Sequence, residues 1–156
     1  MRAIKNKDTQ PEILFRKALH SRGLRYRLHL KSLPGSPDIV LPKYKTAVFI
    51  NGCFWHGHRC RFSKVPKTRT EFWLSKISDN ISRDQVTHQK LLDAGWRIAV
   101  VWECAIKGQT RVQLNSNIDQ FIAWINEPQS QGFEMPSTCS YSSECKQTIL
   151  NKSRIS

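Results

Sequence analysis

The sequence predicts an α/β protein in which a mixed β-sheet carries helices on both faces. The first observation is the order of apolar patterns along the chain, which reads helix, strand, strand, strand, helix, strand, helix. The second is the length, because 156 residues suit one domain with one modest core. The third is that the chain turns to small and polar residues after Pro128. We therefore expect one domain over 1–127 and a disordered C-terminal tail over 128–156.

The first half of the chain predicts one helix and three strands. The segment Thr9-Gln10-Pro11-Glu12 has the pattern of a capping box with proline in the first turn, so we expect a helix over 11–22 that ends at Gly23. Apolar and basic residues alternate over 24–30, as in a strand with one exposed basic face. After a turn at 33–37, the short apolar runs 38–41 and 46–50 predict two buried strands.

The second half predicts two helices around a strand. A second capping-box pattern, Thr68-Arg69-Thr70-Glu71, opens a helical stretch that runs to Ala94-Gly95, with a break expected near Ser78. Residues 96–102 predict a strand of mixed exposure, and 110–126 predict the last helix. The reactive residues follow positions 33, 50 and 102, at the strand ends where sites on such sheets gather.

The charge of the chain points to a polyanionic partner. The formal net charge is +13, and residues 1–127 carry 22 Lys and Arg against 10 Asp and Glu. Each cation that neutralises a phosphate releases counterions, although a surface charged only for solubility is the alternative. No apolar run approaches the roughly 20 residues that span a bilayer, and the N-terminus lacks a signal peptide's apolar stretch. We expect a cytoplasmic protein with no membrane partner.

The octet 53–60, Cys-Phe-Trp-His-Gly-His-Arg-Cys, has the composition of a metal site. With the distant Cys104 it offers Cys53, His58 and Cys60, a three-thiolate, one-imidazole set that suits a closed structural zinc site. Buried reduced cysteines are the alternative. His56 alternates with His58 and Cys60, so any of the three could be a ligand. A spare imidazole beside a basic surface is either a candidate general base or a packing residue.

Three further signals are ambiguous when each is taken alone. Asp38 follows Pro37 at the head of a strand, where a carboxylate can hold a divalent ion, but a turn-ending aspartate is the simpler interpretation. Phe54, Trp55 and Trp73 either pack a small core or stack on bases. A polar stripe at helical spacing, which a solvated helix face explains equally well, contains Lys76, Asn80 and Asp84.

Several segments together carry a resemblance to a known family. In order, they are Met1-Arg2-Ala3-Ile4, Leu-Pro-Gly-Ser-Pro-Asp (33–38), Asn-Gly-Cys-Phe-Trp-His-Gly-His-Arg-Cys (51–60), Lys-Val-Pro-Lys-Thr-Arg-Thr-Glu-Phe-Trp (64–73) and Gly-Trp-Arg-Ile-Ala-Val-Val-Trp-Glu-Cys (95–104). Over about residues 1–125 the chain resembles the very short patch repair (Vsr) endonucleases. The resemblance implies a restriction-endonuclease-like fold. It also implies a magnesium-dependent nick beside a T:G mismatch left by deamination of 5-methylcytosine in double-stranded DNA.

The resemblance also assigns roles to individual residues. It implies that Asp38 binds magnesium, assisted by the backbone carbonyl of Ile50, that His56 is the general base and that Asp84 is the carboxylate near it. The implied zinc ligands are Cys53, His58, Cys60 and Cys104. The implied DNA contacts are the wedge residues Phe54, Trp55 and Trp73, the mismatch-contacting Lys76 and Asn80, and Met1 and Ile4 in the N-terminal segment. We further expect a nucleoid-associated monomer with a functional link to a cytosine-5 DNA methyltransferase.

The chain departs from the family pattern at Asn51, where the best-known members carry a histidine thought to assist at the scissile phosphate. An amide can hydrogen-bond a phosphate but cannot shuttle a proton. We count Asn51 among the catalytic candidates. Two alternatives follow: a non-catalytic, zinc-stabilised DNA-binding module, and a nuclease with altered specificity.

Overall fold

Five strands form one mixed sheet in the structure, a computed structural model that describes residues 7–135. In order across the sheet, they are β1 (Arg27–Leu28), β2 (Ile39–Leu41), β3 (Thr46–Asn51), β4 (Arg97–Trp102) and β5 (Gly132–Met135). The first three pair antiparallel, whereas β4 runs parallel to β3 and β5 runs parallel to β4. The N-terminal end of β2 therefore meets the C-terminal ends of β3, β4 and β5. We call this the carboxyl end of the sheet.

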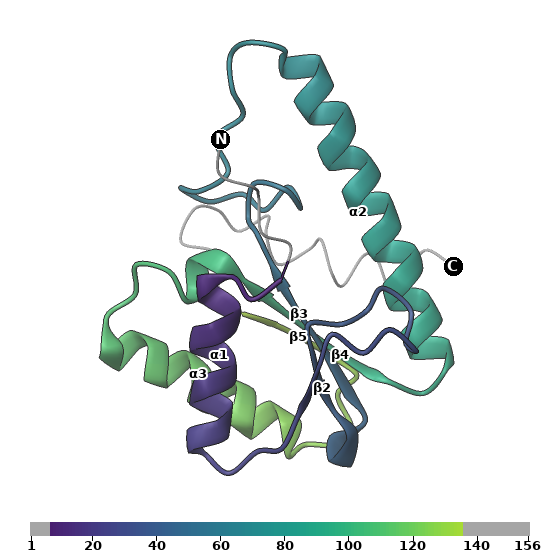
Figure 1. The fold of residues 1–156 in the computed structure, drawn as a ribbon, viewed down its shortest axis with the longest axis vertical. Helices are drawn as coiled ribbons and strands as arrows, with labels where there is room; N and C mark the ends of the chain where they lie inside the picture. Colours follow the sequence, from purple (N-terminus) through teal and green to yellow (C-terminus); the bar gives the residue numbers. More distant parts are fainter. Residues whose placement is uncertain (1–6, 136–156) are drawn as a thin grey trace.

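Helices cover both faces of the sheet, as the sequence predicted (Figure 1). The helices α1 (Gln10–Ser21) and α3 (Arg111–Ile125) pack on one face, where the rings of Phe15 and Phe121 lie 5.3 Å apart. The C-terminal part of α2 (Thr70–Asp93) covers the other face through the buried Leu91. Successive residues of β4 alternate between these two cores, which is the period of a strand buried on both faces.

The first predicted helix is confirmed together with its cap. The Thr9 hydroxyl accepts a hydrogen bond from the Glu12 amide, and the Glu12 carboxylate accepts one from the Asp8 amide at 3.0 Å. The Thr9 hydroxyl satisfies an amide that the first turn of a helix leaves without an intrahelical partner, and the Glu12 carboxylate holds the residue before the N-cap. Glu12 is thereby fixed at the start of α1 although it is almost fully buried.

The start of α2 differs from the prediction. Its N-cap is Arg69, in a left-handed conformation with φ of 56°, and no side chain caps the helix. The Thr70 hydroxyl instead donates to the carbonyls of Pro66 and Lys67, so the second capping box was wrong. The expected break near Ser78 was wrong too, because α2 is continuous over 24 residues.

No helix within residues 7–135 has the length and apolar character needed to cross a membrane.

Two other expectations need correction. The strand expected over 24–30 is only β1, because His29 takes a left-handed conformation (φ 47°) and its amide donates to the carbonyl of Asp38. Residues 132–135, which we expected in a disordered tail, form β5 instead. The Arg97 guanidinium fixes the approach to β5 by donating to the carbonyls of Trp124, Ile125, Glu127 and Ser130. Residues 1–6 and 136–156, with Cys139 and Cys145, lie outside the described part.

Candidate functional site

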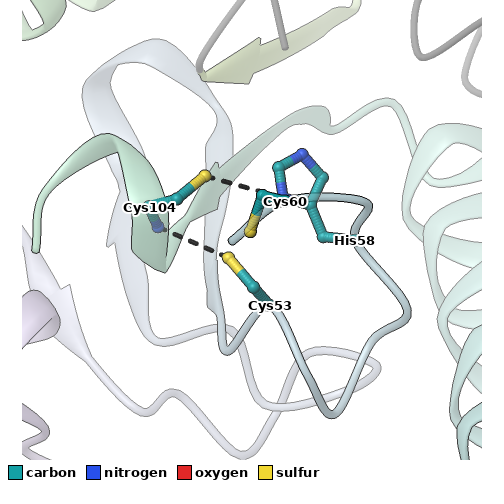
Figure 2. Close-up of side chains that lie close together, drawn as sticks. All are labelled: Cys53, His58, Cys60 and Cys104. Atoms are coloured by element: carbon teal, nitrogen blue, oxygen red, sulfur yellow. Dashed lines mark hydrogen bonds between the residues drawn. The ribbon is translucent and has the colours of Figure 1, made fainter. Parts of the chain in front are cut away.

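Three cysteines and one histidine converge beyond the carboxyl end of the sheet (Figure 2). Cys53 follows β3, and His58 and Cys60 lie in the loop after it. Cys104 lies in the short 3-10 helix η2 (Glu103–Ala105) that follows β4. Because β3 and β4 are parallel neighbours, the segments after them meet, and the four candidate ligand atoms lie within 4.8 Å of one another. The structure therefore brings together the predicted metal-ligand set, which we call the Cys/His cluster.

The hydrogen bonds of the Cys/His cluster suit a metal site. The Cys104 amide donates a hydrogen bond to the sulfur of Cys53, and the Phe62 amide donates one to the sulfur of Cys60. Both donor–sulfur distances are 3.4 Å. The hydrogen bond with Cys104 is the main cause that lowers the pKa of Cys53 to about 4, and the same contact raises the pKa of Cys104. Burial raises the pKa of Cys60. Without a metal the cluster therefore favours one thiolate, whereas a bound cation would require all three thiols to lose their protons.

Trp102, the last residue of β4, separates the Cys/His cluster from a second group of polar residues. Its ring stacks on the His58 ring, with centroids 4.3 Å apart and planes inclined by 12°. The same ring lies 6.4 Å from the His56 ring. The Trp102 indole N–H donates to Oε1 of Glu134 on β5 at 2.6 Å. Trp102 is thus fixed by the stacked His58 ring and by the Glu134 carboxylate. Its ring lies between the Cys/His cluster and His56.

His56 and Asp84 form an imidazole–carboxylate pair. Oδ2 of Asp84, in the middle of α2, lies 2.5 Å from Nδ1 of His56. An ionised carboxylate can only accept a hydrogen bond, so this contact places a proton on Nδ1, and in the neutral ring Nε2 is then the acceptor. Gly57 allows this approach, because a Cβ there would lie only 2.9 Å from the Ile81 side chain of α2, and its φ is 68°. The two side chains remain 26% and 31% exposed, so a substrate can reach them.

Asp38 stands just before β2, at the same end of the sheet. Its Oδ2 accepts a hydrogen bond of 2.7 Å from the Ile50 amide on β3. Burial, together with a smaller effect of the nearby Glu12 carboxylate, raises the pKa of Asp38 to about 7 in spite of this hydrogen bond. Electrostatic attraction to His56 acts in the opposite direction. Asp38 and the segment that carries His56 thus lie at the same end of the sheet.

Two residues near Asp38 were missed by the sequence analysis. Nδ1 of His29 lies 3.9 Å from Asp38, and its buried Nε2 lies 3.7 Å from carboxylate oxygens of both Asp8 and Glu12. We had interpreted Glu12 as a capping residue and His29 as part of an exposed strand face. One signal was available: Glu12 precedes Phe15 and Leu19 by three and seven positions, which places a carboxylate on the buried face of α1.

The aromatic residues form a cluster of their own. The ring centroids of Phe54, Trp55 and Trp73 lie 5.1 to 5.9 Å apart in edge-to-face contacts, and Phe72 extends the group at 5.1 Å from Trp73. Phe72 is 44% exposed, and the other three are partly buried. Phe72 was not among the aromatic residues expected to contact DNA. None of the four belongs to the two buried cores of the described residues, so this aromatic cluster is a surface feature beside His56.

Lys76 and Asn80 lie next to the aromatic cluster on α2. The Lys76 ammonium lies 5.9 Å from the ring centroids of both Trp55 and Phe72. The Asn80 amide donates to the backbone carbonyl of Trp55 at 2.8 Å, so it fixes the loop that carries this tryptophan. Asn51 is buried at the end of β3. Met1 and Ile4, the predicted N-terminal contacts, lie outside the described residues.

Comparison with known proteins gives a consistent result. The family model "DNA mismatch endonuclease Vsr" matches residues 1–62. The chain is 46% identical over 121 residues to the type II nicking enzyme V.XorIIP of Xanthomonas oryzae pv. oryzae, covering 76% of this chain and 89% of that protein. It is 43% identical over 125 residues to the DNA mismatch endonuclease Vsr of Escherichia coli K12, covering 80% of each. The chain belongs to the Vsr DNA mismatch endonuclease family.

A third relative, the type II nicking enzyme V.NmeAIP of Neisseria meningitidis serogroup A, is 49% identical over 117 residues, 74% of this chain and 84% of its own length. Membership of the Vsr family confirms the resemblance drawn from the motifs, and with it a DNA endonuclease of mismatch repair. The α/β fold with a mixed sheet is confirmed by the structure. The Cys/His cluster has the donor set of a metal site in this Vsr-family chain.

Proposed function

We propose that this protein is a magnesium-dependent nicking endonuclease. It would cut one strand of double-stranded DNA beside a T:G mismatch left by deamination of 5-methylcytosine. One observation carries the proposal: a partly buried carboxylate, an imidazole–carboxylate pair and a surface aromatic cluster converge at the carboxyl end of one sheet. Family membership supports the reaction class.

Asp38 and Ile50 would hold the magnesium ion, because it prefers oxygen ligands. The N–H and C=O of a strand residue point to the same neighbouring strand. Since the Ile50 N–H points to Asp38, the Ile50 carbonyl faces the Asp38 side as well. Oδ1 of Asp38 accepts none of the hydrogen bonds found among residues 7–135, so this oxygen is available as a ligand. Magnesium, when bound, would polarise the scissile phosphodiester.

His56 would act as the general base. In the neutral ring, the hydrogen bond between Nδ1 and Asp84 makes Nε2 the acceptor, which can take a proton from the attacking water. Asp84 would hold the imidazole in one tautomer and orientation and would stabilise the imidazolium that forms. Asp84 thereby acts through His56 and needs no contact with the DNA.

The Cys/His cluster would hold a structural zinc ion. Three thiolates and one imidazole complete a tetrahedral shell, so no position remains for substrate. The cluster fixes the two ends of the segment 53–60, which carries Trp55 and His56. Its role would be to position these side chains and not to take part in the reaction.

The aromatic cluster would enter the duplex beside the mismatch. Inserting a wedge costs a few kcal/mol of unstacking at each base step, and a mispaired step yields most easily. Phe54, Trp55 and Trp73 are already packed edge to face, so little side-chain freedom is lost when they insert. Lys76 would contact the mismatch, and Asn80 would contribute through the Trp55 loop that it holds.

Asn51 favours a second candidate function, a DNA-binding module that does not cut. It is buried at the carboxyl end of β3, and an amide cannot transfer a proton. Loss of proton transfer at this position would leave binding intact. The same nicking assay, run with and without magnesium, separates the two functions: binding without a magnesium-dependent nick identifies the module.

The proposal is tested by Asp38→Ala on a labelled T:G duplex. We expect nicking to be abolished, because the carboxylate that holds magnesium is removed, while the zinc content stays unchanged. Asp79→Ala is the matched control, since Asp79 is an exposed carboxylate of α2. Nicking retained by Asp38→Ala would refute the metal role of Asp38. In the same assay, Trp55→Ala should weaken the preference for mismatched over matched duplex more than the affinity for matched duplex.

A further inference from the structure

We infer that the segment between the Cys/His cluster and α2 is a binding surface for the sugar-phosphate backbone of double-stranded DNA. We call it the basic strip and define it by Arg59, Arg61, Lys64, Lys67 and Arg69. The inference rests on the proposed function, since it takes DNA as the partner. It adds a contact surface that lies outside the catalytic group and the aromatic cluster.

The first support is charge. The basic strip contains five cations, and no Asp or Glu occurs between residues 53 and 70. All five side chains belong to exposed residues. Among residues 7–135, no carboxylate forms an ion pair with Arg61, Lys64, Lys67 or Arg69. By contrast, Arg16, Arg22 and Lys107 are each paired with an acidic residue. These four cations of the strip therefore present uncompensated positive charge.

The second support is that aromatic rings hold cations at both ends of the strip. The Arg61 guanidinium lies 4.8 Å from the Phe62 ring, and the Lys107 ammonium lies 5.4 Å from the same ring. The Arg69 guanidinium lies 4.7 Å from the Phe72 ring. Such contacts restrict long flexible side chains before any ligand arrives, which lowers the entropic cost of binding.

The third support is position. The strip starts at the Cys/His cluster, which fixes Cys60, and ends where α2 begins. Phe72, which contacts Arg69, is also the outer member of the aromatic cluster. A duplex with this aromatic cluster inserted must pass close to the strip. The ten steps of chain from Arg59 to Arg69 reach at most about 35 Å, enough to follow several phosphates of one strand.

The test is the salt dependence of binding to a matched duplex, measured by fluorescence anisotropy between 50 and 200 mM KCl. The triple variant Arg61→Ala, Lys64→Ala, Lys67→Ala should reduce the slope of log K against log salt by about 3, because each lost phosphate contact contributes about 0.9. The matched control is Lys17→Ala, Lys43→Ala, Lys90→Ala, which removes the same charge from exposed residues of α1, η1 (Pro42–Tyr44) and the last turn of α2. The slope of this control should change by less than 1.

A second variant guards against loss of folding. Lys64→Gln with Lys67→Gln leaves every ring contact of the strip in place and should reduce the slope by about 2. Zinc content and melting temperature check that each variant is folded. An equal change for the strip variants and the control would overturn the inference, since net charge alone would then explain it. An unchanged slope in folded strip variants would also overturn it. Because binding to a matched duplex needs no cleavage, failure of the nicking proposal would not alter this readout.

Discussion

The two candidate metal sites lie at the same end of the sheet but are built in opposite ways. The Cys/His cluster supplies four donors from the chain itself, with all ligand atoms within 4.8 Å of one another. The Asp38 site supplies one carboxylate, of which one oxygen is already engaged by the Ile50 amide. A shell completed by the protein excludes other ligands, whereas an incomplete shell needs water and a phosphate to fill it. The comparison separates a site that stabilises structure from a site that can carry out chemistry.

Disrupting the Cys/His cluster should have the largest effect. Cys53→Ala removes a fully buried ligand and should reduce the bound zinc from about one ion per chain to near none. Structural zinc contributes about 10 to 16 kcal/mol in small peptides, so even a part of this should lower the melting temperature by more than about 10 °C. Cys145→Ser is the control, because it removes a thiol that is not one of the four proposed ligands. An unchanged melting temperature in metal-free Cys53→Ala would contradict a structural role.

A change in the reactive group should leave stability intact and affect the rate. Asp84→Asn keeps the size of the side chain but removes the charge that fixes the His56 tautomer and stabilises its protonated form. We expect the single-turnover nicking rate to fall by about 10² to 10⁴, with affinity for the T:G duplex and zinc content unchanged. A rate within a factor of about three of the unaltered protein would show that His56 does not need Asp84.

The smallest effect, and the sharpest contrast between the sites, concerns pH. Asp38 has a pKa of about 7 without metal, so below pH 7 magnesium must displace a proton from it. Magnesium affinity should therefore fall about tenfold for each pH unit below 7 and level off above about pH 8. Zinc affinity should keep rising above pH 8, because the pKa values of Cys60 and Cys104 lie above their ordinary value. Parallel metal titrations between pH 5.5 and 9 would measure both, and a pH-independent magnesium affinity would rule out a role for the Asp38 proton.

The two sites also differ in how well the sequence predicted them. The Cys/His cluster was predictable because three of its ligands lie within eight residues, and a zinc shell accepts few residue types. The surroundings of Asp38 come from α1, the end of β1 and β3, and no local pattern connects these segments. The left-handed conformation of His29, which turns its ring towards Asp38, has no signal in an alternating sequence. His29 and Glu12 were therefore recognised only in the folded chain.

The helices and strands also differ in how well the sequence predicted them. Periodic apolar residues predicted α1, β2, β3, β4 and α3 with ends correct to one or two positions. The capping box at Thr68 failed because the Thr70 hydroxyl binds the preceding carbonyls. β5 was missed because its four residues show no alternation, and pairing with β4 and the bonds of Arg97 determine its place. Tertiary contacts decided these elements and local pattern did not.

The place of β5 sets a practical limit on how far this enzyme can be shortened. A version that stopped at residue 127, where composition suggests a boundary, would lack β5 and leave β4 as an exposed edge strand. Its unpaired amides and carbonyls could then recruit other chains, and the sample would tend to precipitate. The indole of Trp102 would also lose its Glu134 acceptor, beside both the Cys/His cluster and His56. Tags and fusion partners on this protein should therefore be joined after Met135.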